Sequence, residues 1–291
     1  MEPKLKGQLY IFISCLFFAI SSVLVKFVSS EFSSFFVSLF RFVIGIALGF
    51  GILIVSKQKF KVQNKFSWVL RGITGFISMV LFYLAIEMTN SGRATLLNNM
   101  YPVFVLIFGM LFFKEQIHKK GIIGLGLCVI GIFIVFYDGN HYRVLGDIIG
   151  ILSGIIMGIA THYTKESSQN EHPAIVYLSA CFMGLLLIPF SLGEITKISL
   201  YSFFLLFMIG LTSFLAQLFM TDGYKYVSAT EGSMISYLKI PITIILTSFL
   251  GEKLGWEFFV GTLLIIIGLY FNITSKKKTS SVNVLKILTK Q

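Results

Sequence analysis

The sequence predicts an all-α integral membrane protein, with ten transmembrane helices arranged as two inverted-topology repeats of five helices. Three observations lead to this prediction. Hydrophobic residues make up 56% of the 291 residues, charged residues only 13%, and the mean hydropathy is +0.86, which is far more apolar than a soluble domain. Apolar runs of about 20 residues, the length that crosses a bilayer, recur along the whole chain. Residues of the first half also match residues of the second half at a nearly constant spacing.

The apolar runs define the spans in order, and their short connections leave no room for a separate soluble domain. The predicted spans are residues 8–27, 34–56, 67–88, 92–113, 119–137, 146–165, 172–191, 200–221, 230–250 and 256–274. No small-residue cleavage site follows the first run, so it is interpreted as a span and not as a signal peptide. The apolar pattern breaks at Asp222, which predicts that the eighth span ends early, near Met220. The three cysteines are scattered through apolar runs and form no disulfide or metal-site spacing.

The distribution of basic residues predicts that both termini are cytoplasmic. With the N-terminus inside, five Lys and Arg residues fall on the outer side, three fall within spans, and the remaining 16 of the 24 fall on the cytoplasmic side. This bias follows the positive-inside rule. Residues 276–291 are then a basic cytoplasmic tail. The net charge of +11 is explained by this topology, so we expect no nucleic-acid partner.

An internal repeat divides the chain into residues 1–138 and 139–275. The matching pairs are Glu115 with Glu252, Gly124 with Gly261 and Gly131 with Gly268 at a spacing of 137, and Pro102 with Pro241, Gly7 with Gly146, Ser14 with Ser153 and Lys26 with Lys165 at 139. Five spans are an odd number, so the second repeat enters the membrane in the opposite sense. Inverted repeats of this kind are typical of secondary transporters, which bind their substrate at the repeat interface near the bilayer midplane.

Several short motifs resemble those of the drug/metabolite transporter superfamily, and within it the EamA-type ten-helix permeases. The motifs are Tyr83-Leu84-Ala85-Ile86, Tyr101-Pro102-Val103-Phe104 and Phe113-Lys114-Glu115-Gln116, echoed by Lys239-Ile240-Pro241 and Leu250-Gly251-Glu252-Lys253. The resemblance covers about residues 7–274. It implies a central cavity lined by helices 1–4 and 6–9, with helices 5 and 10 at the periphery, and transport of small metabolites.

Lys239 is the leading candidate for a substrate-binding residue. At 1.5 Å per residue it lies about 14 Å into the ninth span, close to the midplane. A cation on a lipid-facing surface at this depth costs several kcal/mol, so it is expected to face the bundle interior. All 13 Asp and Glu residues fall in connections or near span ends. Three interpretations stay open: the lysine is neutral, it binds carbonyls freed by Pro241, or the substrate supplies the negative charge.

Other polar residues are expected to complete the site. The candidates are Tyr237, Asn98, Tyr101, Arg41, Tyr83, His162, Gln217 and Ser233. For each of these, an interhelical hydrogen bond is an alternative to substrate contact, and Arg41 has the further alternative of reaching the membrane interface. His162 and Lys239 are the candidate carriers of a coupling proton, while facilitated diffusion and exchange remain alternatives.

Two prolines and two glutamates are candidate gating or structural residues. Pro102 and Pro241 lie inside the fourth and ninth spans, where proline removes a hydrogen bond and kinks the helix. Glu115 and Glu252 lie at the ends of the same spans, where they either cap and anchor helices or form a gate. Small residues let helices approach closely in lipid, so the paired glycines of the fifth and tenth spans are expected to pack helices together.

These observations favour a secondary transporter over other classes. We predict transport of a small metabolite that carries at least one carboxylate or phosphate. An amino acid or an organic acid fits, bound as an anion or a zwitterion. The alternative is an exporter of neutral or hydrophobic drug-like compounds. No catalytic constellation, nucleotide loop, metal spacing or channel filter is present in the sequence, so no enzyme activity and no cofactor are predicted. The expected location is the cytoplasmic membrane of a bacterium, in contact with its lipids.

Overall fold

The computed structural model describes residues 2–89, 91–113, 115, 118–136, 144–249 and 255–275. Throughout these residues the regular structure is helical. The first half contains α1 (Pro3–Val28), α2 (Ser34–Val55), α3 (Lys65–Met88), α4 (Ser91–Asn98), α5 (Tyr101–Leu111) and α6 (Lys119–Phe136). The second half contains α7 (Val144–Ser168), α8 (Pro173–Gly184), η1 (Leu185–Leu187), α9 (Ile188–Ser191), η2 (Leu192–Lys197), α10 (Leu200–Tyr224), α11 (Ala229–Ile235), η3 (Ser236–Leu238), α12 (Lys239–Ser248) and α13 (Trp256–Ser275).

Local sequence explains where several of these helices begin. Ser33 precedes α2, and its hydroxyl accepts a hydrogen bond from the Phe36 amide. Ser199 and Ser202 form a reciprocal capping box at the start of α10. Pro173 occupies the first position of α8, where its missing N–H costs nothing. These caps satisfy amides that lack a partner inside the helix.

Eight helical segments within the described residues are long and apolar enough to cross a membrane. Arg93–Leu111 counts as one segment across α4 and α5, and Pro173–Lys197 counts as one across α8, α9 and the 3₁₀ turns. The remaining two predicted spans coincide with the interrupted run from α11 to α12 and with α13. The apolar composition and helical length therefore agree with an integral membrane protein.

The eighth span is longer than the sequence predicts, and the expected end near Met220 is wrong. Helix α10 continues to Tyr224. Its last turn packs on α1, where a Cβ on Gly223 would lie 2.9 Å from the carbonyl oxygen of Gly7. Asp222 also pairs with Lys225 at 2.6 Å. The contact of Gly223 with Gly7 and the ion pair of Asp222 with Lys225 stabilise this turn. A hydropathy pattern detects neither interaction.

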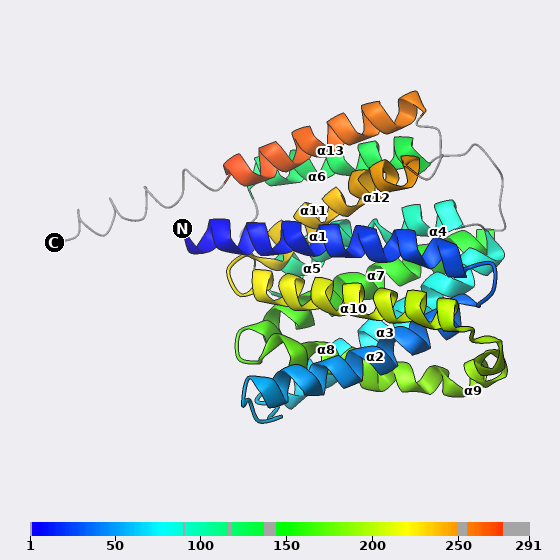
Figure 1. The fold of residues 1–291 in the computed structure, drawn as a ribbon. Coiled ribbons are helices and arrows are strands. Elements are labelled where there is room, and N and C mark those ends of the chain that lie inside the picture. Colours follow the sequence, from blue (N-terminus) through cyan, green and yellow to red (C-terminus); the bar gives the residue numbers. More distant parts are fainter. Residues whose placement is uncertain are drawn as a thin grey trace.

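The helices run side by side, with α6 and α13 together at one edge and α2, α8 and α9 at the other (Figure 1). The most extensive contacts join helices from different halves of the chain: α1 packs along α10, α3 along α7, and α6 along α13. Helix α2 packs on α8 and α10, while α3 packs on α8. The two halves are therefore interleaved, and most of the core lies between them.

Glycines make the contact between α6 and α13 very close, as the sequence predicts. A Cβ on Gly131 would lie 2.6 Å from the carbonyl oxygen of Gly261, and a Cβ on Gly268 would collide with the carbonyl oxygen of Gly124. Each glycine of one pair thus meets a glycine of the other pair. Because only the absence of a side chain permits this approach, the prediction that these residues pack helices together is confirmed.

Two spans are interrupted near their prolines. The fourth span breaks between Asn98 and Tyr101, and Pro102 lies in the first turn of α5. The ninth span passes through the 3₁₀ turn η3, and Pro241 is the third residue of α12. Proline cannot donate the hydrogen bond that a continuous helix requires. Both interruptions lie beside the cavity described next.

Candidate functional site

A cavity of about 350 Å³ lies between the two halves of the chain. Its wall combines aromatic and methionine side chains with polar groups from both halves. The apolar part includes Phe18, Phe42, Met79, Phe82, Met157 and Met220. The polar part includes Ser22, Arg41, Arg71, Ser78, Tyr83, Thr95, Asn98, Asn99, Tyr101, Tyr177, Gln217, Ser236 and Lys239. A volume of this size, with an apolar wall and a few polar groups, is typical of a small-molecule site.

Three cations line the cavity, namely Arg41, Arg71 and Lys239. None of the lining residues in the described part of the chain is Asp or Glu. The cavity therefore has a positive wall without an acidic side chain to neutralise it. Buried charge is costly unless it is paired, and the described lining of this wall supplies no side chain that could pair with the three cations.

Lys239 begins α12, directly after the turn η3. Its ammonium nitrogen lies 5.5 Å from the centre of the Tyr101 ring, a cation–π distance. Within the described residues it has no ion-pair partner and its ammonium makes no hydrogen bond. The aromatic contact orients the lysine without neutralising it.

Arg41 and Arg71 come from α2 and α3. The guanidinium group of Arg41 lies 5.1 Å from the centre of the Phe42 ring, and one terminal nitrogen lies 3.8 Å from the Met79 sulfur. Its guanidinium group therefore lies at the cavity wall. Arg71 is 5% exposed and its guanidinium group folds against Gly75, where a Cβ would collide with it. The Nε atoms of both arginines are buried without a hydrogen-bond partner among the described residues.

Three further polar atoms at the cavity are buried without a partner in the described part of the chain. They are the side-chain oxygens of Asn99, Tyr177 and Gln217. Buried polar atoms are nearly always hydrogen-bonded in folded proteins, to protein or to water. Their concentration at one cavity indicates a place where a ligand or water completes the hydrogen bonding.

Six of the site residues predicted from the sequence line this cavity: Lys239, Tyr101, Asn98, Arg41, Tyr83 and Gln217. Two of them also form interhelical hydrogen bonds. The Asn98 amide donates to the Ser153 hydroxyl at 3.0 Å, and the Tyr83 hydroxyl is bonded to Ser38. Asn98 and Tyr101 lie on either side of the break between α4 and α5, and both still reach the cavity.

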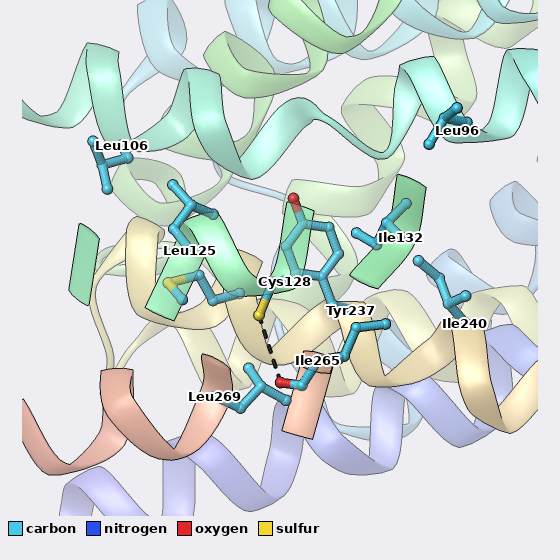
Figure 2. Close-up of a cluster of buried hydrophobic side chains, with 10 residues drawn as sticks. Leu96, Leu106, Leu125, Cys128, Ile132, Tyr237, Ile240, Ile265 and Leu269 are labelled. Atoms are coloured by element: carbon cyan, nitrogen blue, oxygen red, sulfur yellow. Dashed lines mark hydrogen bonds between the residues drawn. The ribbon is translucent and has the colours of Figure 1, made fainter. Parts of the chain in front are cut away.

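The structure places Tyr237, His162 and Ser233 away from the cavity wall. Tyr237 is 0% exposed and packs with Cys128, Ile132 and Ile265 against α6 and α13 (Figure 2). The 3₁₀ turn that contains it aims its ring at this apolar cluster, whereas Lys239 leaves the turn toward the cavity.

His162 and Ser233 bond within the helical scaffold. The Nε2 atom of His162 lies 2.8 Å from the Val105 carbonyl oxygen, and its ring stacks on Phe113 at 4.1 Å. The Ser233 hydroxyl donates to the Thr230 carbonyl within its own helix at 2.9 Å. Both side chains are buried at positions that serve contacts between or within helices.

Glu115 joins the end of the fourth span to the start of the ninth. One carboxylate oxygen accepts from the Ala229 amide at 3.1 Å, and the other accepts from the Thr230 hydroxyl at 2.7 Å. These bonds join Glu115 to the first residues of α11 in the other half of the chain. Glu252 lies outside the described residues.

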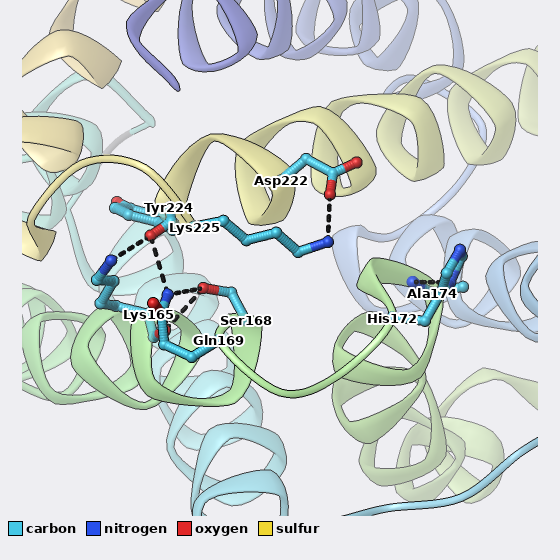
Figure 3. Close-up of polar contacts among 8 residues, drawn as sticks. All are labelled: Lys165, Ser168, Gln169, His172, Ala174, Asp222, Tyr224 and Lys225. Atoms are coloured by element: carbon cyan, nitrogen blue, oxygen red, sulfur yellow. Dashed lines mark hydrogen bonds and ion pairs between the residues drawn. The ribbon is translucent and has the colours of Figure 1, made fainter. Parts of the chain in front are cut away.

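A second polar cluster joins α7 to the end of α10 (Figure 3). The Lys165 ammonium and the Gln169 amide both donate to the Tyr224 carbonyl oxygen, at 2.5 and 3.3 Å. Beside them Lys225 pairs with Asp222. These bonds tie the two helices together at their C-terminal ends.

Arg71 is the main site residue that the sequence interpretation does not single out. Its position inside a predicted span is a sequence signal, because an intramembrane arginine usually faces a bundle interior or a cavity. Asn99, Ser78 and Thr95 carry no comparable signal, since short polar side chains are frequent in membrane helices.

Comparison with known proteins places this architecture among transporters. The sequence model of the EamA-like transporter family matches residues 5–137 and again residues 144–274. The chain is 26% identical over 238 residues to the pseudopaline exporter CntI of Pseudomonas aeruginosa, covering 80% of this chain and 84% of that protein. It is 24% identical to the S-adenosylmethionine uptake transporter of Rickettsia prowazekii, covering 97% of each chain. One solved crystal structure shares the fold at 14% identity, with a TM-score of 0.79 over 93% of this chain and 98% of that chain.

Proposed function

Because the chain belongs to the EamA-like transporter family and is a multi-pass membrane protein, we propose that it is a secondary transporter for a small carboxylate-bearing metabolite. An amino acid or an organic acid fits this description. The observation that carries the proposal is the cavity wall, which presents Arg41, Arg71 and Lys239 with no acidic residue among its described lining. Alternating access through this cavity moves the substrate between the two sides of the membrane.

The arrangement of helices supports ten spans in two inverted repeats, residues 1–138 and 139–275. The family model matches each half separately. When α4–α5, α8–α9 and α11–α12 are each counted as one span, α1 packs on the eighth span and α3 on the sixth. If each span number is advanced by five, counting on from ten to one, the pair of spans 1 and 8 becomes the pair of spans 6 and 3. The fifth span packs on the tenth, and this shift returns the same pair.

The distribution of basic residues and the bacterial relatives support the proposed topology. We propose that both termini, with the tail of residues 276–291, are cytoplasmic and that the protein lies in the cytoplasmic membrane of a bacterium. One relative is named as an exporter and another as an uptake transporter. The proposal therefore assigns no fixed direction, and the substrate gradient determines the direction of transport. His162 has no cavity role in this proposal because its ring bonds the Val105 carbonyl.

The test compares the wild type with Lys239→Met in ligand-dependent unfolding. Anionic, zwitterionic, neutral and cationic metabolites are added to each purified protein, and the thermal midpoint is recorded. A ligand at 100 times its Kd stabilises the protein that binds it by about 2.7 kcal/mol. We expect a carboxylate to raise the midpoint of the wild type and to lose this effect in the folded mutant. Lys59→Met, at an exposed lysine in the connection after α2, is the matched control.

Uptake into proteoliposomes then tests the ligand that stabilises the wild type. Transport by the wild type and Lys59→Met, with loss in Lys239→Met, supports the proposal. A response limited to neutral hydrophobic compounds, equal in all three proteins, contradicts it and supports the drug-export alternative.

A further inference from the structure

The three cations of the cavity fall into two groups, Arg41 with Arg71 on one wall and Lys239 on another. Arg41 and Arg71 belong to α2 and α3, and both of these helices pack on α8. Arg41 lies against Phe42 and Met79, which pack in one cluster with Tyr177 of α8, and Tyr177 lines the cavity together with both arginines. The two arginines therefore form one positive pole around Tyr177, which we call the arginine pole.

Lys239 forms a separate pole on another wall. It belongs to α12, which packs on α1 and α13, and its ammonium lies against the Tyr101 ring of α5. This lysine pole and the arginine pole line the same cavity, together with Asn98, Asn99 and Gln217.

The chemistry of the two poles differs. A guanidinium group is planar and binds a carboxylate or phosphate through two parallel hydrogen bonds, whereas an ammonium acts as a compact point charge. The Nε atoms of both arginines and the Tyr177 hydroxyl have no partner in the described part of the chain. The arginine pole thus holds several hydrogen-bond donors that one anionic group can satisfy together.

A substrate with a single carboxylate satisfies only one pole. If it binds Lys239, two guanidinium charges stay without a counter-charge in a membrane interior, where an unpaired charge is costly. If it binds the arginines, Lys239 stays unneutralised. We propose, on the basis of the proposed function, that the physiological substrate carries two separated anionic groups, one bound at the arginine pole and the other at Lys239.

The test compares dicarboxylates with monocarboxylates of the same length. Succinate, glutarate and adipate are paired with butyrate, pentanoate and hexanoate, and the Kd of each is measured for the purified protein by titration calorimetry. We expect at least one dicarboxylate to bind tenfold or more tightly than its monocarboxylate. The preferred length reports the separation of the two poles.

Variants at each pole then test the assignment of the anionic groups. In Lys239→Met and in Arg71→Lys, the preference for the dicarboxylate is expected to fall at least fivefold, while the Kd of the monocarboxylate changes less. Arg71→Lys keeps the buried charge but loses the planar fork, so it is the variant of choice at this buried site. Arg41→Lys provides the same test from the less buried member of the arginine pole, and Lys59→Met is the control.

The outcomes separate this inference from the proposed function. Equal binding of each dicarboxylate and its monocarboxylate overturns the two-pole inference and leaves a carboxylate transporter in place. A dicarboxylate preference that is unchanged in the pole variants also overturns it. Failure of every carboxylate to bind the wild type overturns both.

Discussion

Arg93 and Asp147 join the two halves of the chain through two hydrogen bonds. The Arg93 Nε donates to one carboxylate oxygen at 2.9 Å, and a terminal nitrogen donates to the other at 2.8 Å. Gln8 stands 139 residues before Asp147, which is the spacing of the internal repeat. The side-chain amide of Gln8 donates to Glu231 at 2.7 Å. The first pair links the starts of α4 and α7, and the second links the starts of α1 and α11. Figure 1 shows α1 and α4 beginning at opposite ends of the bundle.

Breaking these two pairs is expected to shift cavity access in opposite directions. Asp147→Asn weakens the link between α4 and α7, and Gln8→Ala weakens the link between α1 and α11. Arg93 and Asp147 are partly exposed, and the buried Glu231 keeps its ion pair with Lys4 of α1 when Gln8 is replaced. Each substitution is therefore expected to cost about 1 kcal/mol, which corresponds to roughly a fivefold change in population. The readout is labelling of a cysteine introduced at Ser22 on the cavity wall, by an impermeant maleimide added to one side of oriented vesicles. Parallel changes in the two variants would contradict the idea that the pairs close opposite faces.

The contact of Glu115 with Thr230 predicts a measurable coupling between the fourth and ninth spans. Glu115→Ala removes the acceptor for the Thr230 hydroxyl and for the Ala229 amide. Loss of the partner of a buried donor costs about 1–3 kcal/mol, so the thermal midpoint is expected to fall. Thr230→Val removes only the hydroxyl and is expected to cost less. In the double variant the two losses are expected to be less than additive, and simple additivity would show that the residues do not act on each other.

The glycine contact of α6 with α13 predicts a position-specific loss of stability. Gly131→Val places a side chain where only 2.6 Å separates a Cβ from the Gly261 carbonyl oxygen. Overpacking of this kind costs about 1–3 kcal/mol, and we expect a lower midpoint of thermal unfolding in detergent. Gly126→Val on the same helix is the control, because a Cβ there meets nothing within 4 Å. Equal effects of the two substitutions would mean that helix propensity and not close packing determines the result.

The helical segments could be predicted from the sequence because hydropathy records which residues face lipid or core. The predicted starts at residues 34, 119, 200 and 256 coincide with the first residues of α2, α6, α10 and α13. The position of the two interruptions also followed from Pro102 and Pro241. The course of the chain through each interruption did not follow, because the 3₁₀ turn η3 depends on packing against α1 and α13.

The cavity residues that carry a charge at membrane depth could be predicted from the sequence, and the neutral cavity residues less well. Lys239 and Arg41 were identified because burial of their charge requires a reason. Tyr237 stands 139 residues after Asn98, at the spacing of the internal repeat, but it packs in an apolar cluster (Figure 2). A tyrosine ring is stabilised equally well by apolar neighbours, so its sequence position does not distinguish the two environments.

The interrupted fourth span leads to a prediction that separates stability from transport. Pro102 lies in the first turn of α5, where a missing N–H removes no hydrogen bond. Pro102→Ala is therefore expected to change the free energy of unfolding by less than about 1 kcal/mol. It also removes the barrier to a continuous helix between Asn98 and Tyr101, both of which line the cavity. We expect slower transport in proteoliposomes with an almost unchanged thermal midpoint.

The same substitution at Pro173, which begins α8 away from the cavity wall, is the matched control and is expected to leave transport unchanged. Equal transport by Pro102→Ala and the wild type would mean that contacts with α7, including the bond from Asn98 to Ser153, maintain the interruption without the proline. A lower midpoint together with lost transport would mean instead that Pro102 is needed for folding. Only slow transport by a stably folded variant supports a role of the interruption in the transport cycle.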